Sequence, residues 1–503
     1  MLFFNRQEEL SMNSIEKVSE LMSKKAEIAL GGGKEKLEKQ KQGGLMTARE
    51  RIAALLDEGS FVEIGAFVSA RAEETAADGV ATGYGTVDGR LVYVYSQDNT
   101  VCGGAMGENY GKKIVNIFEM AMKMGAPVVG MLDSDGVRLK EGVYAQSAMG
   151  AVLSAAAKAS GIIPNISIVF GNCAGGSAIG AAMSDFVIVS EKKGRVFVNG
   201  PSVIEATTGK KALSDASYSA SVSGAAHLTG EDDAQCIELA RLLISYIPSN
   251  NLCDAFDLET ADDVNRTSET LQNADAVEDV RIIISEIADD KAFFEIHKDY
   301  ADEVSVGFVR LNGASVGVAA TNGKPLGGCA MEKTARFVRF CDCFNIPVLT
   351  FTNTDGFAVN ADEEKYGLAR KGAELSYAFT GATVPKVNVI VSKAYGTAYT
   401  IFNSKQTGAD IVMAYPFAQA APLDPAAGVG MLYSDRLKNG ESRDALMTEY
   451  VEKEANIYSA AKAGYVDDII DPAQTRQRVI AAFEMLAGKR VSSIPRKHDN
   501  MPL

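Results

Sequence analysis

The feature of this 503-residue chain that most constrains its fold is an internal repeat. The segment "PVVGMLDSDG" at 127–136 aligns without a gap with "PVLTFTNTDG" at 347–356, an offset of 220 residues. "PNISIVFGNCAGGSA" at 164–178 aligns with "PKVNVIVSKAYGTAY" at 385–399, an offset of 221. A weaker pair, 91–104 and 315–328, has an offset of 224. Three matches in the same order at nearly constant spacing predict one duplicated domain.

Each half alternates short apolar segments with helical ones, which predicts an α/β fold with mostly buried strands. The polar, acidic stretch 249–277 is typical of a linker. We expect a helical segment at 1–44, an N-terminal domain at 45–260 and a C-terminal domain at 261–503.

Two short motifs near the N-terminus make local predictions. Residues 14–42 read as charged helix interrupted by "GGGK" at 31–34, which lacks the spacing and the hydroxyl of a phosphate-binding P-loop. Thr47 and Glu50 have the spacing of a capping box, which predicts that a helix begins after Thr47.

Composition excludes several classes of protein. The chain has 50 basic and 65 acidic residues and a net charge of −15, a poor match for a nucleic-acid-binding protein. Its 7 cysteines fit a reducing compartment, and Cys341 and Cys343, spaced C-x-C without a second pair, favour buried small residues over a metal site. No run of about 18 apolar residues occurs. We expect a cytoplasmic protein without a metal, starting at Met1 or Met12.

The turn within "SIVFGNCAGGSAIG" at 167–180 is the strongest candidate for a site. A strand that passes into a helix through Gly175 and Gly176 leaves backbone N–H groups at the start of the helix, where they can bind a negatively charged oxygen. One such turn alone would favour a close helix–strand contact that needs glycine. The copy "AYGTAY" at 394–399 makes two oxyanion holes the better interpretation.

Side chains for acid–base catalysis are scarce. The three histidines are His227, His297 and His498. The first two read as residues that satisfy local hydrogen bonds, and His498 lies in the polar tail. No Ser–His–Asp arrangement is predicted. The sequence therefore favours a reaction with two oxyanions and no side-chain base.

Several segments resemble the biotin-dependent acyl-CoA carboxyltransferases, and the resemblance covers residues 45–500 in order. They are "ARERIAALLDEGSFVE", "GYGTVDGRLVYVYSQD", "KKIVNIFEMAMKMGAPVVG", "ASGIIPNISIVFGNCAGG", "ARFVRFCDCFNIP", "ATVPKVNVIVSKAYGTAY" and "RKHDNMPL". The nearest members are propionyl-CoA carboxylase β chains and methylmalonyl-CoA decarboxylase α subunits. The resemblance implies two tandem crotonase-like (ClpP/crotonase) spiral domains.

The resemblance also implies a function. The N-terminal half would bind a short-chain acyl-CoA, the C-terminal half would bind biotin on a separate carrier protein, and a carboxyl group would move between them. Biotin would act as its own base. Further partners would be a biotin carboxylase or a membrane decarboxylase subunit, and six chains would form a hexamer with active sites between subunits.

The family's site residues map onto this chain by motif. The backbone oxyanion holes map onto Gly175 and Gly176 in the first half and onto Thr397 and Ala398 in the second. The resemblance implies substrate contacts at Gly136, Val137, Ala174, Tyr395, Gly396 and Thr400, of which Thr400 helps to choose the acyl group.

The chain departs from the family pattern near both holes. The usual D-S-G-G-A-R is "DSDGVR" at 133–138, the usual V-P-G-F is "TDGF" at 354–357, and Thr397 replaces a glycine, where a β-branched residue would resist positive φ. These changes leave two alternatives open: another crotonase-like CoA-ester enzyme, and a non-catalytic CoA-binding paralogue.

The tetrapeptide "AMKM" at 121–124 matches the sequence around the biotinyl lysine of carrier domains. Carriers present that lysine at a hairpin turn. Here Ile114, Ile117, Phe118 and Ala121 recur at helical spacing, which predicts a helix and an unmodified Lys123.

Overall fold

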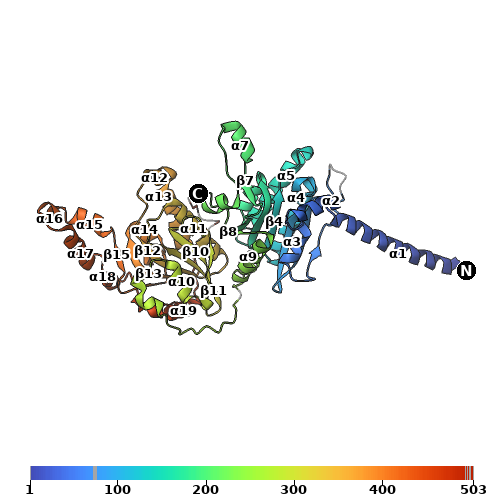
Figure 1. Cartoon of the computed structure of the whole chain (residues 1–503). Helices are drawn as coiled ribbons and strands as arrows, with labels where there is room; N and C mark the ends of the chain where they lie inside the picture. The colour runs from blue at the N-terminus through green and yellow to red at the C-terminus, as the bar shows by residue number, and fades with distance from the viewer. Residues whose placement is uncertain are drawn as a thin grey trace. The chain divides into compact units, whose positions relative to one another are not determined.

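The computed structural model describes residues 2–71, 76–255, 257–492, 494, 497 and 500–501 (Figure 1). Two compact units divide the chain, Met1–Ser245 and Tyr246–Leu503, and each contains one copy of the repeat. His498, expected in the polar tail, lies outside the described residues.

The first unit is built on an eight-stranded sheet with the order β1-β2-β3-β4-β5-β6-β8, and β7 pairs with β5. The strands are β1 Val62–Glu63, β2 Val80–Val87, β3 Arg90–Gln97, β4 Val128–Ser134, β5 Asn165–Ala174, β6 Phe186–Ser190, β7 Arg195–Phe197 and β8 Leu228–Gly230. β1, β2 and β3 are antiparallel, and all pairings from β3 onward are parallel.

The second unit repeats this sheet with the order β9-β10-β11-β12-β13-β14-β16, and β15 pairs with β13. The strands are β9 Phe294–Ile296, β10 Val304–Leu311, β11 Ala314–Thr321, β12 Val348–Thr354, β13 Lys386–Tyr395, β14 Ile411–Ala414, β15 Gln419–Ala421 and β16 Asp468–Ile469. β3, β4 and β5 match β11, β12 and β13 at the offsets of the sequence repeat. The predicted duplication and α/β class are confirmed.

Helices between the strands are also repeated. In the first unit α4 Glu108–Met124, α5 Val143–Ala159 and α6 Gly176–Ala182 follow β3, β4 and β5. Their counterparts are α11 Gly328–Cys343, α12 Ala361–Tyr366 with α13 Leu368–Gly381, and α14 Gly396–Ile401. In α4 the four predicted apolar residues are buried and Lys123 is exposed, which confirms the helical interpretation of "AMKM".

The N-terminal helices follow the predicted pattern. α1 Leu2–Ala29 ends before the glycines and α2 Lys34–Gln42 begins after them. A Cβ atom on Gly32 would lie 1.9 Å from the Thr100 carbonyl oxygen, so the glycine run is needed for close approach to the loop after β3. α3 Ala48–Leu55 begins with the predicted Thr47–Glu50 capping box.

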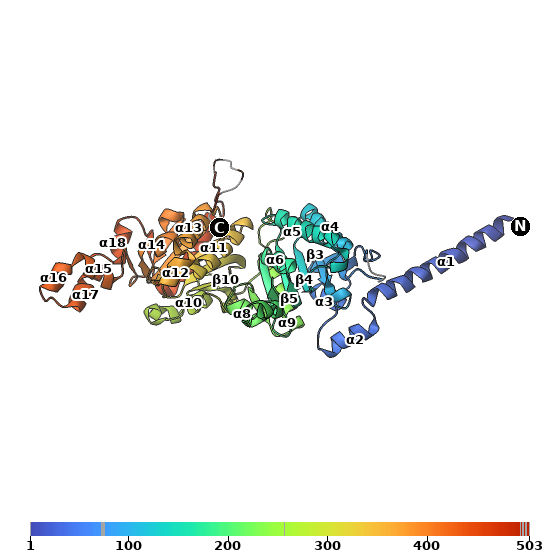
Figure 2. The ribbon, with the colours of Figure 1, turned by 90° about the horizontal axis from the view of Figure 1, so that it is seen from above.

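The remaining helices cover the sheets and form a lobe. They are α7 Pro201–Thr208, α8 Ala216–Ser221 and α9 Asp233–Tyr246 after β7 and β8, α10 Val280–Ile287 before β9, α15 Pro425–Leu432, α16 Ser434–Lys438, α17 Arg443–Lys453 and α18 Ile457–Lys462 between β15 and β16, and α19 Thr475–Leu486 at the end. α15 and α17 enclose a small core of Val429, Leu446, Tyr450 and Ala455, and this lobe extends beyond the sheet of its own unit (Figure 2). Among the described helices, none combines the length and apolarity that crossing a bilayer requires.

Candidate active site

In the loop after β4, the N–H group of Val137 points away from the hydrogen bonds that the loop makes with Met106. Met106 N donates to the Gly136 carbonyl at 2.8 Å, and Arg138 N donates to the Met106 carbonyl at 2.9 Å. This parallel bridge uses the residues on both sides of Val137, so the Val137 N–H points away from it. Gly136 has φ 112°, a conformation that requires glycine.

The loop after β12 repeats this geometry. Leu326 N donates to the Gly356 carbonyl at 2.8 Å, and Ala358 N donates to the Leu326 carbonyl at 2.9 Å. Gly356 also has φ 112°, and Phe357 takes the place of Val137. Phe357 was missed in the sequence, although the repeat aligns it with Val137 at an offset of 220.

The turn after β5 supplies a second N–H group in the first unit. Gly175 has φ 60° and its N–H donates to the Phe197 carbonyl on β7 at 2.9 Å, so this predicted donor is engaged within the fold. The first turn of α6 closes with Ala178 N donating to the Gly175 carbonyl at 3.2 Å. The N–H groups of Gly176 and Ser177 precede that bond, at the positive end of the helix dipole.

The turn after β13 is its counterpart. Gly396 has φ 67° and begins α14, and Thr397 and Ala398 lie in the first helical turn of α14. The positive φ falls on Gly396, and Thr397 is absent from the described non-glycine residues with positive φ. The predicted strain at Thr397 is therefore wrong, because the glycine one position earlier takes the left-handed conformation.

The loop and the turn lie side by side in each unit. A Cβ atom on Gly136 would lie 3.8 Å from the Ala174 carbonyl oxygen. Asn172 Nδ2 donates to Asp135 Oδ1 at 2.8 Å in the first unit, and Lys393 Nζ lies 2.9 Å from Asp355 Oδ1 in the second. The predicted site residues of each half are thus brought together.

The turn after β5 is called the first turn below, and the turn after β13 the second turn. Tyr395 and Thr400 flank the second turn. The Tyr395 hydroxyl donates to Gln419 Oε1 on β15. Burial, with a smaller contribution from the Asp355 carboxylate, raises the pKa of Tyr395 to about 12, so the phenol stays protonated at neutral pH. Thr400 is exposed on α14, and its Oγ1 donates to the Gly396 carbonyl at 3.4 Å.

The two histidines that the structure describes, His227 and His297, do not join either turn. His227 is buried and its Nδ1 accepts a hydrogen bond from Val187 N at 3.1 Å, as expected for a structural residue. The His297 carbonyl accepts from the buried Lys333. Among the described residues, no group of three or more His, Cys, Asp and Glu side chains is placed to hold a metal ion.

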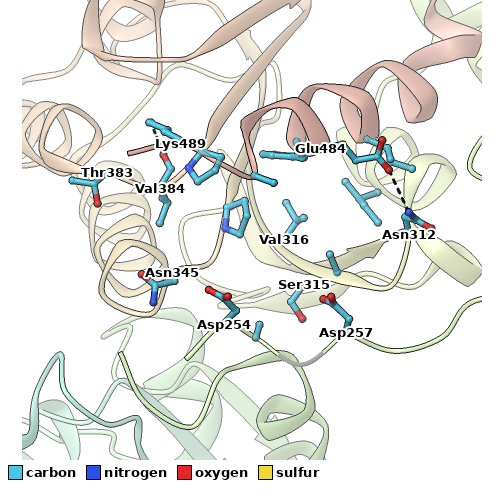
Figure 3. A pocket seen from close by; sticks show the side chains of 18 of the residues that line it. Asp254, Asp257, Asn312, Ser315, Val316, Asn345, Thr383, Val384, Glu484 and Lys489 are labelled. Atoms are coloured by element: carbon cyan, nitrogen blue, oxygen red, sulfur yellow. Dashed lines mark hydrogen bonds between the residues drawn. The ribbon is translucent and has the colours of Figure 1, made fainter. Parts of the chain in front are cut away.

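Two cavities bear on the location of the site. A cavity of about 30 Å³ lies beneath the first turn, lined by Met106, Met149, Gly176 and Ser177 among others. A larger cavity of about 680 Å³ in the second unit lies at the amino ends of β11, β12 and β13, the edge opposite the turn (Figure 3). Ser315, Asn345 and Thr383 line it there, and the segment around Asp254 and the C-terminal residues Glu484 and Lys489 close it.

Comparisons with known proteins agree with this geometry. The family model described as the carboxyl transferase domain matches residues 39–501. The chain is 42% identical to the methylmalonyl-CoA decarboxylase subunit alpha of Veillonella parvula, over 97% of this chain and 99% of that protein. It is 40% identical to the propionyl-CoA carboxylase carboxyltransferase subunit of Haloferax mediterranei, over 98% of this chain and 100% of that protein.

The solved structures give the same result. The chain superposes on transcarboxylase 12S, a hexamer solved with methylmalonyl-coenzyme A bound, with a TM-score of 0.93 and 37% identity over 97% of this chain and 99% of that chain. The crotonase-like fold predicted from the sequence is consistent with this match. The chain belongs to the carboxyl transferase domain family.

Proposed function

We propose that this chain is a carboxyltransferase subunit that moves a carboxyl group between carrier-bound biotin and a short-chain acyl-CoA of the propionyl or methylmalonyl type. The proposal is supported above all by the loop and turn that recur at matched positions in both halves of a chain 42% identical to a methylmalonyl-CoA decarboxylase subunit. Transcarboxylase 12S, which has the same fold, was solved with methylmalonyl-CoA bound.

In the first unit we assign the oxyanion hole to the N–H groups of Val137 and Gly176. Both belong to segments in contact through Gly136 and Ala174, and neither donates to a carbonyl in the turn geometry described above. Two fixed donors stabilise the negative charge that develops on a thioester oxygen when its α-carbon loses a proton. Gly175, predicted as a second donor, then has a different role in this assignment: its positive φ orients the N–H group of Gly176 toward the ligand.

In the second unit the matching donors are the N–H groups of Phe357 and Thr397, with Ala398 behind them in the same turn. They fit the ureido oxygen of biotin, which has the same need for hydrogen bonds to a developing negative charge. Biotin, when bound, supplies the carried carboxyl group. Tyr395, held by Gln419 and protonated at neutral pH, lines the same turn without acting as a base.

Homo-oligomerisation is part of the proposal. Leu139 and Val359 occupy matched positions two residues after Val137 and Phe357, and their side chains are 88% and 98% exposed. Large apolar side chains beside both turns are typical of surfaces that another subunit covers. Transcarboxylase 12S assembles as a hexamer, and we expect six chains here by light scattering after size exclusion.

The experiment is carboxyl exchange with the purified chain. Methylmalonyl-CoA labelled in its free carboxyl group is incubated with biotinamide, label is followed into the biotin derivative, and the unlabelled propionyl-CoA left behind is measured separately. Transfer that requires both substrates supports the proposal. Acyl-CoA binding without transfer would instead support the non-catalytic alternative, and hydrolysis of the thioester would support another crotonase-like enzyme.

A further inference from the structure

Lys393 and its partner Asp355 distinguish the second turn from the first. Asp135 and Asp355 are matched residues, each directly after a strand and directly before a glycine with φ 112°. Their partners are also matched, at an offset of 221, but differ in charge. Asn172 donates to Asp135 Oδ1 at 2.8 Å, whereas the Lys393 ammonium lies 2.9 Å from Asp355 Oδ1.

This difference gives the two rims different ion pairing: Lys393 contacts Asp355 directly, whereas in the first unit the basic residue, Arg195, stands one strand further on, on β7 beside Asn172. At the first turn the hydrogen-bond partner of the Asp135 carboxylate is a neutral amide. At the second turn the Asp355 charge is balanced by Lys393. A carboxylate that approaches the second rim therefore meets an ammonium group held beside the loop.

Lys393 is available to such a ligand. An ammonium group has three N–H donors, and the contact with Asp355 uses one of them. The Lys393 side chain is 45% exposed, and it stands on β13 four residues before Thr397. Asp355 fixes the ammonium beside the loop that contains Phe357, so the cation lies at the rim of the second turn.

We propose that Lys393 binds the carboxylate of the biotin-borne carboxyl group, with Asp355 as the positioning residue. This inference rests on the proposed function. The contact is one of binding, and Lys393 forms no bond to the group that moves. Charge-assisted hydrogen bonds of this kind are about twice as strong as neutral ones.

The test is direct binding, independent of turnover. Two stable probes are titrated calorimetrically against the full-length protein: biotinamide, and biotinamide carrying a carboxymethyl group on N1′ as a stable carboxylate. We expect the wild type to bind the carboxylate probe about tenfold more tightly than biotinamide, which corresponds to about 1.4 kcal/mol. Lys393→Gln removes that preference while biotinamide binds as before, and Lys393→Arg retains most of it.

Lys298→Gln, which removes an exposed lysine from the same unit, is the matched control and keeps the wild-type preference. A wild type that binds both probes equally, or a Lys393→Gln variant that keeps the preference, overturns this inference alone. A wild type that binds neither probe overturns the proposed biotin site and this inference with it. Loss of biotinamide binding in Lys393→Gln overturns the inference too, because it would show that Lys393 supports the turn as a whole.

Discussion

Each half has its own sheet with the same topology and the same two loops. A buried lysine occupies the same position in both halves, but the groups that contact its ammonium differ. Lys113 in the first half and Lys333 in the second are matched at an offset of 220, and both are buried. Lys113 Nζ lies 3.0 Å from the Asp78 carboxylate. Lys333 Nζ donates to the carbonyls of His297, Tyr300 and Val304 at 2.8, 2.7 and 2.7 Å. Duplication has kept the position of the charge and one acceptor, because Lys113 Nζ also donates to the carbonyl of Val80, which matches Val304. The halves differ in the remaining partners, a carboxylate in the first and further backbone carbonyls in the second.

A second difference concerns the carboxylate beside the first turn. Asp133 is buried and pairs with Arg51 at 3.3 Å, and Arg51 also pairs with Asp233 at 2.9 Å and lies over the Phe170 ring. The matched residue of the second half is the neutral Asn353, whose Oδ1 accepts from Lys393 N at 3.4 Å. The first half therefore depends on a buried ion network that the second half lacks at the matched position.

The largest expected effect follows from that network. Arg51→Met leaves two buried carboxylates without their cation, which typically costs about 3–5 kcal/mol. At about 2–4 °C per kcal/mol, the thermal transition should fall by about 10 °C. Adding Asp133→Asn, which gives the first half the neutral residue of the second, should recover part of the loss. An unchanged transition in Arg51→Met would show that the network contributes nothing to stability.

The next effect, on catalysis, tests the two turns against each other. A Cβ atom on Gly176 would lie 2.7 Å from Met149 Cγ, so substitutions are made in a Met149→Ala background. There, Gly176→Ala keeps the N–H donor, and Gly176→Pro removes it at a helix position that tolerates proline. We expect the proline variant to transfer carboxyl about 10²–10³ times more slowly than the alanine variant.

Equal rates in those two variants would exclude the Gly176 N–H from catalysis. The matched change Thr397→Pro should lower transfer similarly while the dissociation constant for acyl-CoA is unchanged. Circular dichroism and thermal transitions of the Met149→Ala protein, of the two Gly176 variants made in it and of Thr397→Pro separate loss of a donor from loss of the fold.

How much the sequence predicted depends on how far apart the interacting residues are. The capping box at Thr47 and the helical face of 114–121 rest on local spacing, and the repeat rests on segments whose sequences align directly; all three were predicted. The hydrogen bond from Gly175 to Phe197 was not predicted, because Phe197 lies 22 residues beyond Gly175 and the pairing of β7 with β5 leaves no local pattern. The contacts of Asn172 and Lys393 with Asp135 and Asp355 were missed for a similar reason, although the repeat aligns Asn172 with Lys393.

A smaller effect, on pH dependence, should come from Lys333. Burial lowers its pKa from the usual 10.5 to about 8. Between these values the unfolded chain binds more protons than the folded chain, so the free energy of unfolding rises with pH in that window. The rise approaches about 1.4 kcal/mol per pH unit at most.

The measurement is urea unfolding of the wild type and of Lys333→Met from pH 7 to pH 10. The difference between the two stabilities should grow in favour of the wild type as the pH rises above 8. Lys298→Met, which removes an exposed charge from the same unit, controls for net charge. A constant difference between wild type and Lys333→Met across the range would contradict the lowered pKa.

The smallest expected effect is none at all, at Lys123. The tetrapeptide "AMKM" occurs only in the first half, where Lys123 is exposed near the end of α4, and the matched residue of α11 is Cys343. Carrier domains present their biotinyl lysine at a hairpin turn, whereas here the backbone is helical and Ala121 is buried against the sheet. A biotin ligase that reads the turn should therefore not recognise this lysine. Co-expression with a biotin ligase followed by an avidin blot should leave the wild-type chain and Lys123→Arg equally blank, beside a positive carrier control. A band in the wild type that Lys123→Arg abolishes would mean that the end of α4 unwinds far enough to imitate the carrier turn, and that this half can carry the biotin that we assign to a separate protein.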